Sequence, residues 1–308
     1  EIYTLSLHDA LPISTSAQRR GGKGITGITT RDNDFVKDLV MTSTHDYLMF
    51  FTNTGKAHKI KAYEVPEAAR QAKGTPAINF LNLMQRERIT AVIPVREFDE
   101  DKYLIAITKR GLIKKTSLDQ FDTKRTSGLI AINLKDDDEL IAIKQSTGVN
   151  NIIIVTRKGK CICFSEKDVR PMGRIAGGVR AIKLEKDDEV VAMELVEPEQ
   201  QLLVATENGF GKRTPVEEYK IQVRGGKGLL TYDKAKFKKT GALIGAMVVD
   251  EDDEIFLINS EGIIIRIRAE EVSVLGRATQ GVKIMKFDEG TRSEEHTSEL
   301  QSPTSISY

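Results

Sequence analysis

The chain has 308 residues, of which 40% are apolar, enough for one or two packed domains. No run approaches the roughly 18 consecutive apolar residues of a transmembrane helix, so none is expected. The formal net charge is only +1. A surface for a polyanion would therefore depend on where the cations lie, because they exceed the anions by only one.

The two ends of the chain share nothing with its periodic interior. EIYTLSLHDALPIS at the start and RSEEHTSELQSPTSISY at the end resemble translated sequencing-adapter read-through. The first lacks the basic start of a signal peptide. We expect residues 1–16 and 292–308 to be non-native, disordered tails and residues 17–291 to form the folded domain.

The first distinctive stretch of the interior combines three cations with three glycines. It reads Gln18-Arg19-Arg20-Gly21-Gly22-Lys23-Gly24, without a carboxylate or an apolar side chain. Glycines let the backbone lie close to a partner, and N–H groups beside Arg and Lys suit a phosphate. A weaker form returns at residues 222–228. A plain basic surface turn remains the alternative for such a stretch taken alone.

Two landmarks recur about every 50 residues along the interior. One is a tight-turn tetrapeptide that ends at Gly55, Gly111, Gly159, Gly209 and Gly262. The other is a basic residue four positions before a glycine, at Arg20, Arg70, Lys124, Arg174, Arg224 and Arg277. The heptad is thus the first of six equivalent loops.

Each repeat unit predicts four short strands, because runs rich in Ile, Val and Leu alternate with turn residues. In the third unit we expect strands at residues 129–134, 140–145, 151–156 and 160–164. The acidic clusters before strands, such as 136–139 and 187–189, are interpreted as solvated turns in preference to metal sites. Repeated four-stranded units predict blades around an axis, and the absence of Trp excludes WD40 propellers.

The two cysteines, Cys161 and Cys163, lie two positions apart in a predicted strand. Their side chains would share a face about 7 Å apart, too far for an easy disulfide. We interpret them as small buried residues in a reducing compartment and expect no metal site.

The heptad, the stretch from Thr44 to Lys61 and the stretch from Glu207 to Pro215 together resemble the C-terminal domain of the DNA gyrase A protein. The resemblance covers about residues 17–291 and implies an all-β fold, the six-bladed β-pinwheel, whose blades exchange strands. The first unit lacks its front part and the sixth stops near Gly290, so we expect both terminal blades to be incomplete.

The resemblance also implies a function and partners. Duplex DNA would wrap around the outer edge of the disc, so that an ATP-dependent type II topoisomerase introduces negative supercoils. The partners implied are double-stranded DNA, the rest of the gyrase A protein and the gyrase B protein in an A2B2 complex, in the bacterial cytoplasm at the nucleoid. Catalytic residues, ATP and Mg²⁺ would belong to other domains, so we expect no catalytic residue, metal or cofactor here.

The candidate DNA-binding residues are the loop cations together with the whole heptad. They are Gln18, Arg19, Arg20, Gly21, Gly22, Lys23, Gly24, Arg70, Lys73, Lys124, Arg125, Arg174, Arg224, Lys227 and Arg277. The third loop has its charges shifted to Lys124 and Arg125. Further cations flank the turns and are each interpreted as ordinary solvated charges, among them Lys59, Lys114, Lys115, Lys212 and Arg213.

Wrapping requires many contacts. Four strands about 4.8 Å apart give a disc radius on the order of 25 Å. Following half of that edge bends about 30 base pairs through about 180°, at an elastic cost of roughly 10–15 kcal/mol. Six loops that neutralise phosphates and release counterions can offset this cost, whereas one cannot.

Three other functions are alternatives to DNA wrapping by gyrase. The topoisomerase IV C-terminal domain has similar blades, but its heptad is lost or degraded. A protein-binding scaffold would require an exposed apolar patch on a disc face. A hydrolase would need converging groups such as His45 and Asp46, which occupy an ordinary turn. Neither glycine-rich stretch has the Ser or Thr that follows Lys in a nucleotide P-loop.

Overall fold

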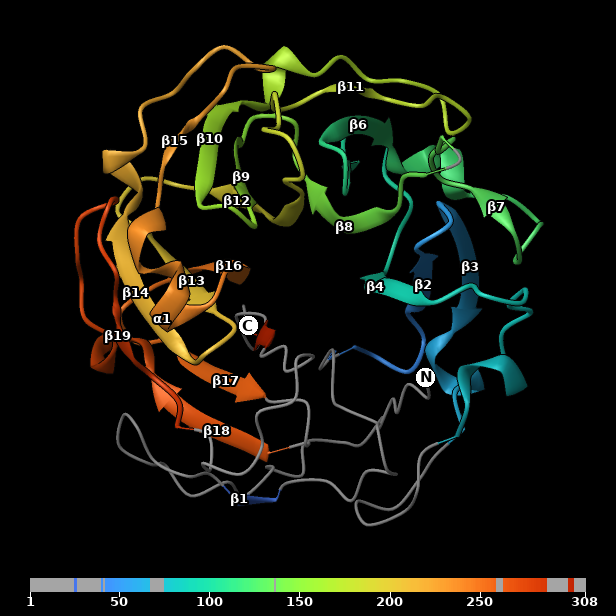
Figure 1. Cartoon of the computed structure of the whole chain (residues 1–308). Helices are drawn as coiled ribbons and strands as arrows, with labels where there is room; N and C mark the ends of the chain where they lie inside the picture. The colour runs from blue at the N-terminus through green and yellow to red at the C-terminus, as the bar shows by residue number, and fades with distance from the viewer. Residues whose placement is uncertain are drawn as a thin grey trace.

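The computed structural model describes residues 25–26, 40, 42–66, 75–135, 137–258, 263–286 and 299–301. These residues form five four-stranded antiparallel sheets, which follow one another around a central axis as blades (Figure 1). The prediction of an all-β, propeller-like disc is confirmed.

Every blade has the same strand order from the centre outwards. Blade 1 contains β4 (Ile89–Val95), β2 (Tyr47–Thr52), β3 (Lys56–Lys61) and β7 (Leu129–Ile130). Blade 2 contains β8 (Leu140–Ser146), β5 (Tyr103–Thr108), β6 (Leu112–Ser117) and β11 (Val179–Arg180). Blade 3 contains β12 (Val190–Val196), β9 (Asn151–Thr156), β10 (Lys160–Ser165) and β15 (Leu229–Leu230).

Blade 4 contains β16 (Leu243–Val249), β13 (Gln201–Thr206), β14 (Phe210–Pro215) and β19 (Val282–Lys283). Blade 5 contains β20 (Glu299–Gln301), β17 (Glu254–Ile258), β18 (Ile263–Arg268) and β1 (Ile25–Thr26). The outer strand of blade 5 is thus supplied by the start of the chain, since β1 pairs with β18 in antiparallel register. This pairing joins the two ends of the ring.

Short helical turns complete the described elements. The 3-10 turns are η1 (Ala62–Glu64), η2 (Ala77–Asn79), η3 (Leu118–Phe121), η4 (Glu166–Asp168), η5 (Val216–Glu218), η6 (Lys234–Lys236) and η7 (Ala269–Glu271). A single α-helical turn, α1 (Phe237–Thr240), follows η6.

The strands expected in the third unit are present, and the exchange of strands between blades that the resemblance implies is confirmed. The predicted third unit is spread over three blades, with β7 in blade 1, β8 in blade 2, and β9 and β10 in blade 3. The first of these strands is also shorter than predicted, because only residues 129 and 130 pair with β3. Each unit therefore supplies the outer strand of one blade, the inner strand of the next blade and the two middle strands of the blade after that.

The tight turns predicted at the recurring glycines are present wherever they are described. At Thr108 the carbonyl accepts a hydrogen bond from the N–H of Gly111, at 2.9 Å, and the hydroxyl accepts from the N–H of Leu112. Thr156 and Gly159 repeat the first contact in the next blade, at 3.0 Å. Gly111 has a φ of +79°, a conformation that favours glycine.

The core lies between the blades, which explains why the strands read as nearly continuous apolar runs. In β9, Ile152 and Ile154 pack in a cluster with Ile105 and Ile107 of blade 2. Residues Ile153 and Val155 of the same strand pack in another cluster, with blade 4. Successive side chains of a strand point to opposite faces of the sheet. A blade that is buried on both faces therefore needs apolar residues at odd and at even positions of its strands.

Cys161 and Cys163 of β10 are free and buried, as predicted. Burial raises the pKa of the Cys161 thiol well above its ordinary value and that of Cys163 to about 11. Both thiols are therefore held in the neutral form, which suits packing and disfavours reactivity.

Candidate nucleic-acid interface

Four of the six predicted basic loops lie in the described part of the chain. They comprise residues 122–128, 170–178, 220–228 and 273–281, and each leads directly into an outer strand. Figure 1 shows β11 and β15 on the outside of the ring, farther from the axis than β8 and β12. The loops are therefore carried on the perimeter. The heptad of residues 18–24 and the loop with Arg70 and Lys73 lie outside the described residues.

The glycine that ends each loop lets the outer strand lie close to the neighbouring strand of its blade. Gly178 and Gly228 have φ values of +81° and +69°. A Cβ atom at Gly178 would lie 2.7 Å from the carbonyl oxygen of Ile113, and one at Gly228 would lie 2.5 Å from that of Cys161. Only glycine fits such a contact with a backbone. The repeated loop glycine thus has a structural reason beyond access for a phosphate.

Three predicted DNA-contacting arginines bridge neighbouring parts of the perimeter. A guanidinium nitrogen of Arg174 donates to the carbonyl of Ile130 at 3.4 Å, and one of Arg277 donates to that of Leu230 at 3.3 Å. Arg224 donates equivalently to the carbonyl of Arg180. Each acceptor is the second residue of the outer strand one unit earlier. The three arginines are half-buried, so part of each guanidinium is committed to this bridge and part faces solvent.

The other predicted cations of the described loops are more exposed. Lys124, Arg125 and Lys227 all lie in the exposed class. The Nε of Arg125 donates to the carbonyl of Ser127 at 2.9 Å. This hydrogen bond holds the guanidinium group against the backbone of its own loop. The described cations therefore lie in loops that lead into outer strands of the blades.

The sequence pattern did not single out three exposed cations of the same loops. Arg170 and Lys220 begin two of them, and Arg180 ends β11. A signal was present for the first two, because each lies four residues before a loop arginine. No comparable spacing marked Arg180 in the sequence. It ends β11, a strand of only two residues, which is too short to show an apolar pattern.

Several cations taken as solvated charges are in fact buried. Lys114 and Lys212 are completely buried, and Lys59, Lys115 and Arg213 are at most 5% exposed. Lys114 donates to the carbonyl of Ala131 at 2.6 Å and also to that of Arg174. Lys212 donates to the carbonyl of Gly276 at 2.6 Å and to that of Arg277. These two ammonium groups therefore lie beneath basic loops and hold their backbones.

Burial has a clear electrostatic effect on the same lysines. Loss of hydration, with the nearby charge of Arg174, lowers the pKa of Lys114 to about 7. Burial likewise lowers the pKa of Lys212 to about 8, with Glu218 acting in the opposite direction. Lys115 instead forms a buried ion pair with Glu166 at 2.8 Å, which links β6 of blade 2 to η4.

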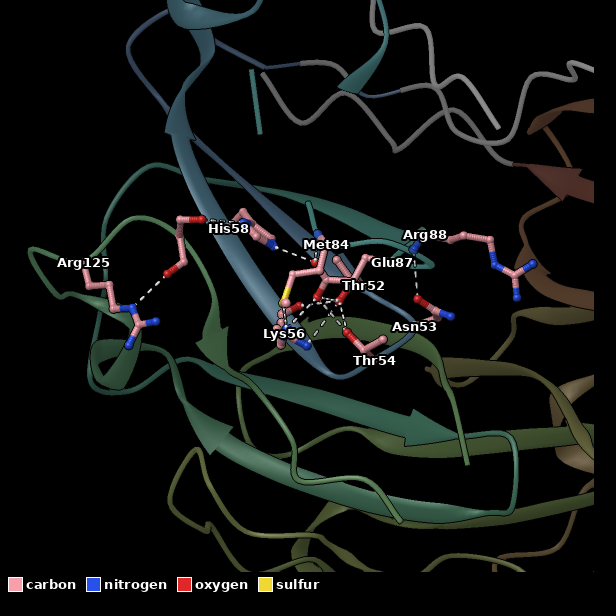
Figure 2. Close-up of polar contacts among 10 residues, drawn as sticks. Thr52, Asn53, Thr54, Lys56, His58, Met84, Glu87, Arg88 and Arg125 are labelled. Carbon is pink, nitrogen blue, oxygen red and sulfur yellow. Dashed lines mark hydrogen bonds and ion pairs between the residues drawn. The ribbon is translucent and has the colours of Figure 1, made fainter. Parts of the chain in front are cut away.

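Blade 1 carries a histidine at the position of these buried lysines. The Nδ1 of His58 lies 3.0 Å from the hydroxyl of Ser127, in the loop that also contains Arg125 (Figure 2). Glu87 lies near the other nitrogen of the imidazole, with its Oε2 3.9 Å from the Nε2 of His58. Its carboxylate accepts hydrogen bonds from the hydroxyl of Thr54 at 2.8 Å and from the N–H of Met84 at 2.7 Å. Burial lowers the pKa of His58 even though Glu87 opposes the shift.

Within the described residues, no group of three or more His, Cys, Asp or Glu side chains is arranged to hold a metal ion. The acidic residues before the strands instead stabilise turns. Asp188, for example, accepts hydrogen bonds from the hydroxyl of Thr156 at 2.7 Å and from the N–H of Lys158 at 2.9 Å. None of the described helices is long and apolar enough to cross a membrane.

Comparison with known proteins agrees with the fold and its repeats. The sequence model of the DNA gyrase C-terminal domain, beta-propeller, matches residues 16–43, 46–96, 102–146, 150–197, 200–250 and 253–290. The DNA gyrase A protein of Clostridium acetobutylicum is 51% identical over 271 residues, which are 88% of this chain and 32% of that protein. The Staphylococcus epidermidis protein is 45% identical over 284 residues, 91% of this chain and 32% of that protein.

Solved structures show the same relationship. A structure of the DNA gyrase A C-terminal domain matches with a TM-score of 0.79 and 28% identity over 94% of both chains. The C-terminal domain of DNA topoisomerase IV matches with a TM-score of 0.74 and 26% identity, over 83% of this chain and 79% of that one. The chain spans about a third of the length of the curated relatives.

Six repeats that exchange outer strands around a ring define a propeller-like β-pinwheel domain. The extent of the sequence match then makes the assignment specific. The chain belongs to the DNA gyrase A C-terminal domain family.

Proposed function

We propose that this chain binds and wraps duplex DNA as the C-terminal domain of a bacterial gyrase A protein. The wrap would follow the perimeter of the disc and present a second duplex segment to the enzyme, so that strand passage introduces negative supercoils. The observation that carries the proposal is the succession of basic loops on one perimeter, bridged by Arg174, Arg224 and Arg277.

The electrostatics of the loops support a polyanion with evenly repeated charges. Exposed cations, including Arg170, Lys220 and Lys227, accompany the bridging arginines. A duplex presents phosphates along its whole length, and each neutralised phosphate releases a counterion. No base-reading helix occurs among the described elements, so sequence preference would come from DNA deformability, as in histone wrapping.

The heptad Gln18–Gly24 and the loop of Arg70 and Lys73 are proposed to extend this surface. Their equivalence rests on the repeat, since β1 follows Gly24 directly just as β11 follows Gly178. The intact heptad also favours gyrase over topoisomerase IV, in agreement with the higher similarity to the gyrase structure.

The remaining parts of the proposal concern the whole enzyme. The partners would be the rest of the gyrase A protein and the gyrase B protein in an A2B2 complex, acting in the bacterial cytoplasm at the nucleoid. ATP and Mg²⁺ would be used by other domains, so the chain alone would catalyse no reaction.

A topological assay tests the wrapping itself. Relaxed closed-circular DNA is incubated with the chain, treated with a type I topoisomerase and deproteinised. Wrapping changes the linking number in proportion to bound protein, and the sign of the change gives the handedness of the wrap. A linking number that stays constant at saturating protein would contradict the proposal and favour a protein-binding scaffold.

A second assay tests the heptad. Replacement of Arg19, Arg20 and Lys23 by Ala in a gyrase A protein carrying this domain is expected to abolish supercoiling by the assembled enzyme, while circular dichroism shows an intact fold. Normal supercoiling by this variant would remove the heptad from the mechanism.

A further inference from the structure

The segment that connects the outer strand β15 to the inner strand β16 is opposite in charge to the same connection in the two preceding units. Residues 133–139 and 183–189, which follow β7 and β11, each contain four carboxylates, with one and two lysines respectively. Residues 233–242 instead contain a single carboxylate and four lysines, which are Lys234, Lys236, Lys238 and Lys239. Three units thus use the same connection, and only this one of the three is basic.

A main-chain carbonyl replaces the acid that the other two connections use. In those connections, Asp138 and Asp188 each accept a hydrogen bond at 2.9 Å from a main-chain N–H of the adjacent tight turn. At the turn between β13 and β14 the equivalent N–H, that of Asn208, donates to the carbonyl of Thr240 at 3.0 Å. Thr240 ends α1, so the helical turn satisfies the tight turn and no carboxylate is needed there.

The backbone of α1 is fixed to the rest of the disc. It lies over the tight turn between β13 and β14, whose Asn208 side chain donates to the carbonyl of Lys239 at 2.9 Å (Figure 1). Phe237 stacks on Tyr232, with ring centroids 5.8 Å apart. The hydroxyl of Tyr232 donates to the carbonyl of Gln280, in the basic loop that leads into β19. The lysines of α1 are therefore presented from a restrained backbone that contacts a perimeter loop.

The cations of α1 adjoin those of the perimeter at blade 4. The ammonium group of Lys239 lies 5.5 Å from the centre of the Phe210 ring, and that of Lys283 lies 5.0 Å from it. Lys283 belongs to β19, the outer strand of this blade. One aromatic ring therefore contacts a cation of the perimeter and a cation of the disc face that carries the tight turns.

Most lysines of this connection also lack the carboxylate partners that other cations of the same face have. Lys109, in the tight turn before β6, pairs with Glu189 at 3.0 Å, and Lys234 pairs with Glu185 at 2.8 Å. The other three lysines of residues 233–242 are exposed, and no carboxylate in the described part of the chain forms an ion pair with them. A polyanion can approach them without displacing an internal ion pair.

We propose that Lys236, Lys238 and Lys239 bind phosphates of duplex DNA, and that they lead the duplex from the perimeter onto the face of the disc at blade 4. This inference rests on the proposed function and adds a contact that the repeated loops do not supply. The position favours a duplex over an acidic protein segment, because these lysines adjoin an outer strand that itself follows a basic loop. Each further phosphate neutralised beside that path releases another counterion.

Salt-dependent binding to a duplex of about 60 base pairs, longer than half of the perimeter, tests the contact. One variant combines Lys236→Gln, Lys238→Gln and Lys239→Gln. The matched control removes three exposed lysines from the two acidic connections, by Lys135→Gln, Lys183→Gln and Lys186→Gln. The α1 variant should reduce the slope of log affinity against log salt by about 2–3, and the control by less than about 1. Both should keep the urea midpoint of the wild type, because exposed side chains are replaced.

A tethered probe locates the contact on the DNA. Lys238→Cys and, for comparison, Lys186→Cys each carry one iron–EDTA group, which cleaves nearby DNA through hydroxyl radicals. Cys161 and Cys163 are buried and should not be labelled. The probe at position 238 should cut both strands over one short region of the duplex, and the probe at position 186 should cut weakly.

Two results would overturn the inference. One is an equal salt slope for the α1 variant and its control. The other is cleavage from position 238 that is no stronger than cleavage from position 186, which would leave these lysines to a partner other than DNA. A wild-type chain that does not bind the duplex at all would instead contradict the proposed function.

Discussion

The side chain of Lys114, in β6 of blade 2, donates a hydrogen bond to the main-chain carbonyl of Arg174, in the basic loop that leads into β11. A buried ammonium group of one blade thereby holds the loop that packs against it. Lys212 and Arg277 repeat the relationship two blades further on. Hydrogen bonds from buried lysines therefore hold the perimeter loops from beneath, and the arginines bridge their outer side.

Replacement of Lys114 by Met tests this support. Met is only one heavy atom shorter than Lys, but it leaves the carbonyls of Ala131 and Arg174 without their donor. We expect a loss of about 1–3 kcal/mol in the free energy of unfolding, measured with urea, together with weaker DNA binding. The matched control is Ile162→Met, at the equivalent position of β10, for which the cost should stay below about 1.5 kcal/mol. Equal stability of Lys114→Met and wild type would contradict the role given to Lys114.

The same lysines should give the stability a distinctive pH dependence. Their pKa values are about 7 and about 8 in the folded state, against about 10.4 for an unfolded lysine. Between these limits the unfolded chain binds more protons, so their contribution to the free energy of unfolding rises with pH from about 7 towards 10. Urea midpoints from pH 6.5 to 9.5 should therefore rise less in a Lys114→Met, Lys212→Met double variant than in the wild type. Parallel profiles would show that the lysines titrate normally.

Two cations of one loop should separate binding from structure. Lys227 is exposed, whereas Arg224 is half-buried and bridges to Arg180 and Asp168. Lys227→Ala should reduce the slope of log affinity against log salt by about 1 and leave the urea midpoint unchanged. Arg224→Ala should reduce the slope similarly and also destabilise the fold by about 1 kcal/mol. The assignment fails if Lys227→Ala destabilises the chain as much as Arg224→Ala does.

Glycines of neighbouring loops should differ sharply in their tolerance of Ala. A methyl group at Gly228 would meet the carbonyl of Cys161 at 2.5 Å with φ at +69°, whereas one at Gly173 would have nothing within 4 Å. We expect Gly228→Ala to cost more than about 2 kcal/mol and Gly173→Ala to stay within about 0.5 kcal/mol, by thermal or urea unfolding. Comparable costs at the two sites would mean that the outer strand is not held as closely as described.

The two cysteines should be chemically silent in the folded protein. Cys161 and Cys163 are buried, and burial raises the pKa of both thiols. A disulfide reagent such as DTNB at pH 8 should label neither residue in buffer and both in denaturing urea. Rapid labelling of the native chain would place these thiols at a surface.

The candidate site was partly predictable from the sequence. The spacing of Arg174, Arg224 and Arg277 located the loops because every unit repeats nearly the same number of residues between its landmarks. That spacing carries no information on what a side chain touches. The bridges made by these arginines, and the burial of Lys114 and Lys212, depend on contacts between residues 17 to 64 positions apart in the chain.

The sequence by itself determined the repeat, the strands and the position of the charged loops. Turns and apolar patterns depend on residues that are close together in the chain. The tertiary structure decided which strands share a blade and which cations reach solvent. A unit such as residues 129–164 cannot cover both of its own faces, so its strands contribute to three blades. That exchange places the loop of one unit over the buried lysine of another, as with Arg174 and Lys114. It therefore decides which cations are buried beneath the loops and which are exposed to solvent.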